Sequence, residues 1–239
     1  MNRKLDARLS AVAAQIRSAT HADIGSDHAR LLVALLETGR INYAIAIENK
    51  RLPFDNSVRA LSDRAAEVRF GDGLSELKIG EADSLSLCGL GAESIRDILL
   101  AHPDRIPKHV VIEVCQKPEV IRRWAFENGF NLVGDQTTLG ARSFTILSFQ
   151  RAVNPMKNDC AYDDVDRDAA FAFGPFVLKR ADRQFDIQLQ NQEAWWRKFG
   201  RLSPAASDRL SLLRRVMLDR RVRSLEIESD LPSPAEVPS

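Results

Sequence analysis

The stretch Ala22-Asp23-Ile24-Gly25-Ser26-Asp27-His28 is the most informative part of the chain, because it ends a short apolar strand and leads into a helical pattern. Gly25 permits a tight turn and lets a ligand approach the backbone closely. The helix that follows offers free backbone amides to a negatively charged group. A strand, a glycine turn and a helix in this order are typical of an α/β sheet whose ligands bind at the carboxyl ends of the strands.

Short apolar runs alternate with helical patterns on both sides of this stretch. The predicted strands are residues 21–24, 43–48, 68–70, 84–88, 110–115, 130–135 and 143–149. The predicted helices are residues 5–16, 28–37, 56–66, 93–100 and 119–128. This alternation indicates a mostly parallel sheet. The last two strands should form an antiparallel hairpin, because the segment between them is too short for a helical crossover.

The pattern changes after residue 150. Residues 151–177 are predicted to be a linker, because residues 154–168 are polar, hold a run of acids and are typical of a linker or flexible loop. Residues 178–227 predict a helical hairpin, since an apolar stripe continues to Phe199, Gly200 stops it, and Ser203-Pro204 opens a second helix. Residues 228–239 are predicted to be disordered, because prolines crowd the end of the chain.

Charge is unevenly distributed although the net charge is only +1. Residues 178–223 hold twelve Lys and Arg against five Asp and Glu, whereas the rest of the chain is net acidic. This concentration favours a polyanionic partner. A merely solvated helical face is the alternative.

Composition excludes several classes of protein. With 44% hydrophobic and 28% charged residues the chain is an ordinary globular one. The longest apolar run, Leu31–Leu36, is far short of the roughly 20 residues of a membrane-spanning helix, so no membrane partner is expected. Three cysteines without CxxC spacing and a charged N-terminus without a signal region favour the cytoplasm. The oligomeric state stays open between a monomer and a weak dimer.

The loop after the first strand suits a ligand that carries both an ammonium and a carboxylate group. Asp23 and Asp27 would repel a diphosphate, and the G-x-G-x-x-G of dinucleotide sites is missing. S-adenosylmethionine carries both groups and fits the loop better. The alternative is a plain turn whose aspartates cap the helix.

Two further acids follow the next two strands. Glu48 ends the second strand, where a carboxylate can accept both hydroxyls of a ribose. Asp72, in Gly71-Asp72-Gly73-Leu74, follows the third strand and can accept an adenine amino group. One acid after each of three successive strands predicts a cofactor site, although each alone would be read as a solvated loop acid.

The fourth strand ends in a glycine turn, Cys88-Gly89-Leu90-Gly91-Ala92. Its position adjoins the switch point of a doubly wound sheet, and two glycines let the backbone approach a reacting group. An ordinary Gly-rich turn is the alternative. Cys88 is predicted to be a small buried hydrophobe. The histidines at positions 21, 102 and 109 lack metal-ligand spacing and are predicted to be structural or surface residues, so no metal is expected.

These motifs resemble the TrmK family, S-adenosylmethionine-dependent methyltransferases that act on N1 of adenine 22 in tRNA. The similar segments are Asp23–Ala29, Ala44–Glu48, Gly71–Leu74, Gly89–Ala92, Arg123-Trp124, Asn128–Phe130, Ser143–Ile146 and Phe173–Phe176. They span nearly the whole chain. The chain departs from the family at Arg30-Leu31-Leu32, where the family has Tyr-Leu-Pro, at Ala92, where it has glycine, and at Gln116–Glu119, where it has Gln-Pro-Asn.

The resemblance implies a class I (Rossmann-like) methyltransferase domain over residues 1–150, with a seven-stranded, mostly parallel sheet, followed by the α-helical hairpin. It also implies S-adenosyl-L-methionine as cofactor, held by Asp23, Gly25, Ser26, His28, Glu48, Asn49, Asp72, Gly73 and Gly89. Asp27 is the expected catalytic residue, as acceptor for the amino group of the target adenine. N1 of adenine has its own lone pair, so alignment and exclusion of water matter more than a strong base.

The basic hairpin is then expected to bind tRNA. The residues expected to contact its phosphates are Lys179, Arg180, Arg183, Arg197 and Lys198. Trp195 and Trp196 either stack on exposed bases or pack in the helical core. Two other functions stay open: a non-catalytic RNA-binding relative of the family, and a methyltransferase for another RNA or a small molecule.

Overall fold

The structure is a computed structural model of the 239-residue chain. It describes residues 5–26, 28–138, 144–154, 159–180, 183–199 and 201–229, with side chains of the last helix up to Arg221. The chain divides into two compact units, Met1–Asp163 and Asp164–Ser239.

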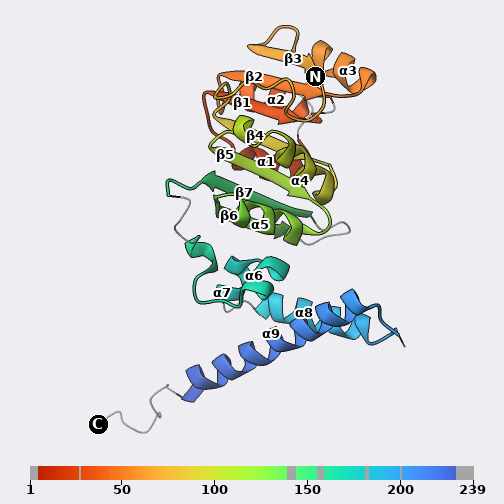
Figure 1. The fold of residues 1–239 in the computed structure, drawn as a ribbon, viewed down its shortest axis with the longest axis vertical. Helices are drawn as coiled ribbons and strands as arrows, with labels where there is room; N and C mark the ends of the chain where they lie inside the picture. The colour runs from red at the N-terminus through yellow and green to blue at the C-terminus, as the bar shows by residue number, and fades with distance from the viewer. Residues whose placement is uncertain are drawn as a thin grey trace, which may run out of the picture. The chain divides into compact units, whose positions relative to one another are not determined.

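The first unit is built on a seven-stranded sheet of order β3-β2-β1-β4-β5-β7-β6 (Figure 1). Its strands are β1 (Thr20–Ile24), β2 (Tyr43–Glu48), β3 (Ala66–Phe70), β4 (Ser84–Cys88), β5 (His109–Val114), β6 (Phe130–Thr138) and β7 (Phe144–Arg151). Strands β1 to β5 are parallel, and β7 is antiparallel to both β5 and β6. The predicted parallel sheet with a final antiparallel hairpin is confirmed.

Helices cover both faces of this sheet. They are α1 (Ala7–Ala14), α2 (Arg30–Glu37), α3 (Arg51–Leu61), α4 (Ala92–Ala101) and α5 (Pro118–Glu127), with short 3-10 turns η1 (Pro103–Arg105) and η2 (Cys160–Tyr162). Apolar residues of α1, α2 and α3 share one buried cluster with Ala44 and Val111 of the sheet. On the other face, Trp124 of α5 stacks on Phe130 and meets Phe149 edge to face. Helix α4 packs beside α5 (Figure 1).

The switch point of the sheet lies between β1 and β4. These strands are adjacent and parallel, but the chain leaves β1 into α2 on one face and leaves β4 into α4 on the other. The two exits therefore diverge and leave room beside the carboxyl ends of both strands.

The starts of α2 and α3 differ from the predicted ones. Helix α2 starts at Arg30 instead of 28, because His28 (φ 65°) and Ala29 (φ 48°) adopt the left-handed conformation. Helix α3 spans Arg51–Leu61 instead of 56–66. Pro53 lies in its first turn, where a missing backbone N–H removes no helical hydrogen bond, and β3 begins soon after the helix ends.

The second unit consists of α6 (Arg167–Phe173), α7 (Pro175–Lys179), α8 (Arg183–Trp196) and α9 (Pro204–Ser229). Helices α8 and α9 contact each other as the predicted hairpin, around a core that includes Phe185, Leu189 and Leu213. The predicted start of the second helix is confirmed, since Ser203 Oγ accepts a hydrogen bond from the Ala206 amide (3.3 Å).

The predicted linker at 151–177 is wrong in its larger part, because it contains η2, α6 and most of α7. Two of the acids that suggested a linker are helix caps: Asp159 accepts from the Ala161 amide, and Asp166 accepts from the Ala169 amide. The predicted stripe over 178–199 is not one helix, since α7 ends at Lys179 and α8 starts at Arg183. Of the tail predicted to be disordered, residues 228 and 229 belong to α9 and the rest lies outside the described residues.

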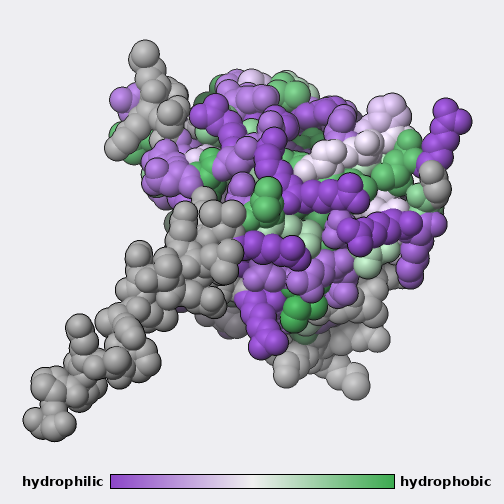
Figure 2. Space-filling model, turned by 90° about the horizontal axis from the view of Figure 1, so that it is seen from below, coloured by the Kyte–Doolittle hydropathy of each residue, from purple (hydrophilic) through white to green (hydrophobic). Residues whose placement is uncertain are grey.

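The surface is largely hydrophilic where Figure 2 shows it: purple residues cover most of the coloured face, and hydrophobic ones are scattered among them. Within the described residues, no helix has the length and apolar character needed to cross a membrane.

Candidate active site

The carboxyl end of β1 places a buried acid at the switch point. Asp23 is only 3% exposed, and its Oδ1 accepts a hydrogen bond from Ser86 Oγ of β4 (2.5 Å). Burial raises the pKa of the Asp23 carboxyl to about 6, although the hydrogen bond from Ser86 and the charge of Arg8 oppose that rise. A cationic ligand group beside Asp23 would favour its ionised form.

The turn after β1 has the backbone shape that the sequence indicated. Gly25 has a φ of 70°, and its amide donates to the Ile47 carbonyl oxygen (3.0 Å). Ser26 is half-buried and His28 is exposed, both within this turn. Asp27, the predicted catalytic residue, lies outside the described residues.

Four predicted cofactor residues gather where β2 and β3 end. Glu48 is 4% exposed, and its Oε1 accepts from Ser57 Oγ of α3 (3.5 Å). Asn49 is exposed and its Nδ2 donates to Asp72 Oδ1 (2.9 Å). Gly73 is buried with a φ of 55°. Two carboxylates thus lie at the carboxyl ends of the neighbouring strands β2 and β3. Glu48 is held by Ser57 of α3, and Asp72 is held by Asn49.

A third buried acid was not predicted. Glu113 of β5 is fully buried, and its Oε2 accepts from both Arg8 Nη1 of α1 (2.7 Å) and the Gly89 amide (3.0 Å). Gly89 itself has a φ of 73°, and a Cβ built on it would meet only Arg8 Nη1, at 4.0 Å. The glycine turn is therefore anchored on one side by a charged carboxylate and open on the other.

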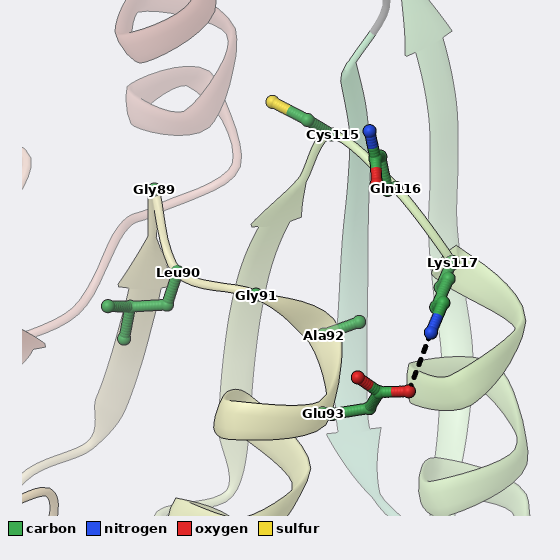
Figure 3. Close-up of a pocket in the computed structure, with 8 residues that line it drawn as sticks. All are labelled: Gly89, Leu90, Gly91, Ala92, Glu93, Cys115, Gln116 and Lys117. Carbon is green, nitrogen blue, oxygen red and sulfur yellow. Dashed lines mark hydrogen bonds and ion pairs between the residues drawn. The ribbon is translucent and has the colours of Figure 1, made fainter.

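A cavity of about 350 Å³ lies beside this turn (Figure 3). Its lining residues are Gly89, Leu90, Gly91, Ala92, Glu93, Cys115, Gln116 and Lys117. At its rim Lys117 Nζ and Glu93 Oε1 point toward one another and form an ion pair (2.7 Å). Lys117 has a φ of 55°, so the chain leaves β5 through an unusual backbone conformation.

Burial raises the pKa of the Cys88 thiol well above its ordinary value. The thiol therefore stays protonated and is a poor nucleophile. The site thus offers carboxylates, amides and glycine backbone for binding and orientation, which suits a reaction whose nucleophile is a lone pair of the substrate.

The five predicted RNA contacts are all exposed, in two groups at opposite ends of α8. Lys179, Arg180 and Arg183 surround its start, and Arg197 and Lys198 follow its end. Arg197 also pairs with Glu193 (3.0 Å), which lowers its net charge contribution. Beside the second group the rings of Trp195 and Phe199 lie 4.7 Å apart and both are about half exposed.

The sequence analysis missed the residues that hold the acids in place. The sequence does hold a signal for some of them, because polar residues alternate along two strands: His21 and Asp23 in β1, and Ser84 and Ser86 in β4. Such alternation predicts a shared buried polar face if the two strands are neighbours. His21 was predicted to be either a structural or a surface residue, and the structure shows that it is fully buried. The partnership of Arg8 with Glu113 had no local signal.

The chain matches the family model described as "Methyltransferase domain" over residues 5–147. It belongs to that family of methyltransferase domains.

Full-length relatives share both units. The tRNA (adenine(22)-N(1))-methyltransferase of Bacillus subtilis (strain 168) is 28% identical over 236 residues, covering 90% of this chain and 97% of the relative. The crystal structure of the B. subtilis tRNA methyltransferase TrmK covers 90% of this chain and 99% of its own, with a TM-score of 0.77 and 28% identity. The structure of M. capricolum TrmK with S-adenosylhomocysteine covers 94% of this chain and 99% of its own, with a TM-score of 0.74 and 19% identity, and shows the likeness of the fold alone. The predicted resemblance and fold class are confirmed.

Proposed function

We propose that this protein is an S-adenosylmethionine-dependent methyltransferase that methylates N1 of an adenine in tRNA. The observation that carries the proposal is the set of three acids, Asp23, Glu48 and Asp72, at the carboxyl ends of three neighbouring strands beside a left-handed glycine turn. The 28% identity to the B. subtilis tRNA (adenine(22)-N(1))-methyltransferase supports the reaction and the substrate class.

The residues at this edge fit the cofactor. Burial raises the pKa of the Asp23 carboxyl and so disfavours its charged form. A cationic partner such as the ammonium group of an amino acid would stabilise that charged form. Gly25 and Gly89 expose backbone at positive φ, where a ligand can approach closely. Ser26 and His28 would complete the first loop, Glu48 and Asn49 would hold the ribose, and Asp72 with Gly73 would hold the adenine. When bound, the cofactor supplies a methyl group on a positively charged sulfur.

The protein's own residues have to bring the target nitrogen into line. N1 of adenine attacks with its lone pair, so the site must orient the base and exclude water. Asp27 is proposed to accept a hydrogen bond from the exocyclic amino group of that base. The cavity beside Gly89 to Ala92 is the proposed place for the base, because it adjoins the switch point and is lined by the glycine turn.

The second unit is proposed to bind the RNA. The five exposed cations at the two ends of α8 would contact phosphates, which supplies affinity without reading sequence. The half-exposed Trp195 and Phe199 offer flat faces on which an unpaired base can stack. A tRNA substrate also makes the cytoplasm the proposed location.

The test is methyl transfer to unmodified tRNA with isotopically labelled S-adenosylmethionine, followed by mass spectrometry of the nucleosides. We expect labelled 1-methyladenosine. Protein that binds the cofactor in calorimetry but labels no tRNA would instead be a non-catalytic RNA-binding relative. Label in a different nucleoside or in a small molecule would move the substrate class. Deletion of residues 164–239 separates these cases, because a small-molecule enzyme should keep its activity without the basic unit.

A further inference from the structure

A row of buried polar side chains runs along β1 and β4 behind the candidate site. Ser84 is the register partner of His21, and Ser86 is the register partner of Asp23, so all four side chains share one face of the sheet. His21, Ser84 and Ser86 are fully buried and Asp23 is nearly so. Polar side chains are buried together in this way when they satisfy one another's hydrogen bonds.

The row is continuous from the amino ends of β1 and β4 to their carboxyl ends. Ser18 Oγ lies 2.7 Å from Ser84 Oγ, and Ser84 Oγ lies 2.6 Å from His21 Nδ1. His21 Nε2 lies 2.8 Å from Ser86 Oγ, which lies 2.5 Å from Asp23 Oδ1. The half-buried Ser18, at the amino end of β1, is thus joined to the carboxyl of Asp23 at the carboxyl end.

Counting protons sets the direction of these bonds when Asp23 is ionised. A carboxylate only accepts, so the single hydroxyl proton of Ser86 goes to Asp23. The contact between Ser86 and His21 then needs a proton on Nε2. His21 Nδ1 is left as an acceptor, and Ser84 donates to it. Every bond of the row points toward Asp23.

The count reverses when Asp23 takes up one proton from solvent on Oδ1, the oxygen that faces Ser86. The carboxyl group now donates to Ser86, Ser86 donates to Nε2, and the imidazole proton must sit on Nδ1 to donate to Ser84. Ser84 donates to Ser18, whose own proton can go to the Thr20 carbonyl oxygen, 3.3 Å from Ser18 Oγ. The imidazole is neutral in both arrangements, and only the position of its proton differs.

We propose that His21 is a positioning residue for Asp23: acting through Ser86, its Nε2–H tautomer holds the Asp23 carboxylate charged and oriented for a cationic group of the ligand. The choice of the cofactor ammonium as that group rests on the proposed function. The tautomer relation itself concerns only the protein. His21 touches no ligand and acts through Ser86, so it is not a catalytic residue.

The surroundings favour a tautomer change over charging of the ring. Burial lowers the pKa of His21 to about 3, with His109 of β5 acting in the same direction, whereas the pKa of Asp23 is raised to about 6. Among the described residues, the charged or titratable groups that interact with Asp23 include Arg8 of α1, which lowers its pKa, and Cys88 of β4. Glu113 of β5 lies behind Arg8 as its ion-pair partner. None of these groups replaces Ser86 as the hydrogen-bond donor to Asp23 Oδ1.

The first test is nitrogen-15 NMR of the His21 imidazole in the ligand-free, full-length protein between pH 5 and pH 8. We expect a neutral ring throughout, with the proton on Nε2 at high pH and on Nδ1 at low pH, and a midpoint near 6. In Asp23→Asn this pH-dependent exchange should vanish. A ring that becomes an imidazolium in this range, or a tautomer that does not change, overturns the proposal.

The second test is calorimetric titration with S-adenosylmethionine at several pH values. His21→Leu should weaken binding about 2- to 10-fold at pH 7.5, the range for one lost neutral hydrogen bond. It should weaken binding more at pH 6, because Asp23 then loses its charge at a higher pH. The matched control is His109→Leu, which removes an imidazole from the neighbouring strand of the same face and should leave binding and its pH dependence unchanged. An equal loss at every pH would show a merely structural His21 and contradict the proposal.

The two tests separate this inference from the proposed function. A tautomer exchange in protein that does not bind the cofactor supports the His21 relation and contradicts the proposed function. Cofactor binding with a fixed His21 tautomer supports the proposed function and contradicts the His21 relation. If His21→Leu fails to fold, the NMR titration of the unaltered protein still decides.

Discussion

Arg8 Nη1 donates to Glu113 Oε2 at 2.7 Å, and this contact joins the first helix to the fifth strand. Glu113 is completely buried, and the same oxygen accepts the Gly89 amide. One carboxylate therefore ties together α1, the glycine turn after β4 and the end of β5. The N-terminal helix is thus part of the site's scaffold.

The first prediction concerns the stability that this pair provides. Arg8→Met should lower the free energy of unfolding by about 2 kcal/mol, because it leaves the Glu113 carboxylate buried with one charged hydrogen bond fewer. The matched control is Arg64→Met, which breaks the more exposed Arg64–Glu37 pair and should cost less than about 1 kcal/mol. Urea denaturation of the full chain measures both. Equal losses would show that burial of Glu113 does not matter.

The second prediction is a pH dependence of stability due to His21. Its pKa is about 3 in the folded protein and 6.5 ordinarily, so the unfolded chain binds a proton that the folded chain does not. Stability from this group is therefore lost as the pH falls from 6.5 toward 3, by up to about 1.4 kcal/mol per pH unit. The contribution of Asp23 to stability has the opposite sign. Its pKa is raised from 3.8 to about 6 in the folded protein, so this contribution is present at low pH and is lost as the pH rises from 3.8 to about 6.

The comparison that isolates His21 is wild type against His21→Leu, unfolded in urea at pH 7, 6 and 5. The free-energy advantage of the wild type should shrink steadily as the pH falls, because only the wild type must charge an imidazole on unfolding. A difference that stays constant with pH would contradict a neutral, buried His21.

The third prediction separates binding from rate. Glu48→Ala should weaken affinity for S-adenosylmethionine by about tenfold to a few hundredfold, since each hydrogen bond to a charged acceptor contributes roughly 1.5–3 kcal/mol. Asp63→Ala, which removes an exposed acid of the same unit, is the control and should bind normally. Calorimetry measures both variants. Unchanged affinity in Glu48→Ala would remove Glu48 from the cofactor site.

The fourth prediction tests Asp27. Asp27→Ala should keep cofactor affinity near normal and lower the rate of methyl transfer, because its proposed partner is the target adenine. Asp27→Asn keeps the size of the side chain and should lose less. Melting curves must accompany the assay. Loss of cofactor binding in folded Asp27→Ala, or transfer at the parent rate, would disprove the catalytic role.

The fifth prediction concerns tRNA affinity. Reversing the charge of Arg183 and Lys198, one at each end of α8, should weaken tRNA binding and reduce its dependence on salt by about one unit of log–log slope for each lost phosphate contact. Lys50→Glu changes an exposed cation of the first unit and serves as the control. Filter binding at several salt concentrations gives the slopes. The same slopes in all proteins would place the RNA elsewhere.

The α/β order and most of the sheet could be predicted from local patterns in the chain. Apolar runs with period two or without gaps predict strands, so β2 and β4 were predicted with their bounds as the structure has them. The carboxylate after each of three strands followed from the same pattern, because parallel strands bring their carboxyl ends to one edge. Local rules also predicted the Ser203-Pro204 helix start. All of these signals involve residues close together in the chain.

The pairing of side chains that are distant in the chain could be seen only in the folded protein. Arg8 and Glu113 are 105 residues apart, and His21 and Ser86 are 65 apart, so no local periodicity relates them. Their partnership depends on sheet order, which places β4 between β1 and β5, and on the face to which each side chain points. The acids around 154–168 show the same limit from the other side. Their polarity predicts a linker, whereas in the structure Asp159 and Asp166 cap helices. A cap is defined by the backbone amide that donates to the side chain, and that contact is known only once the chain is folded.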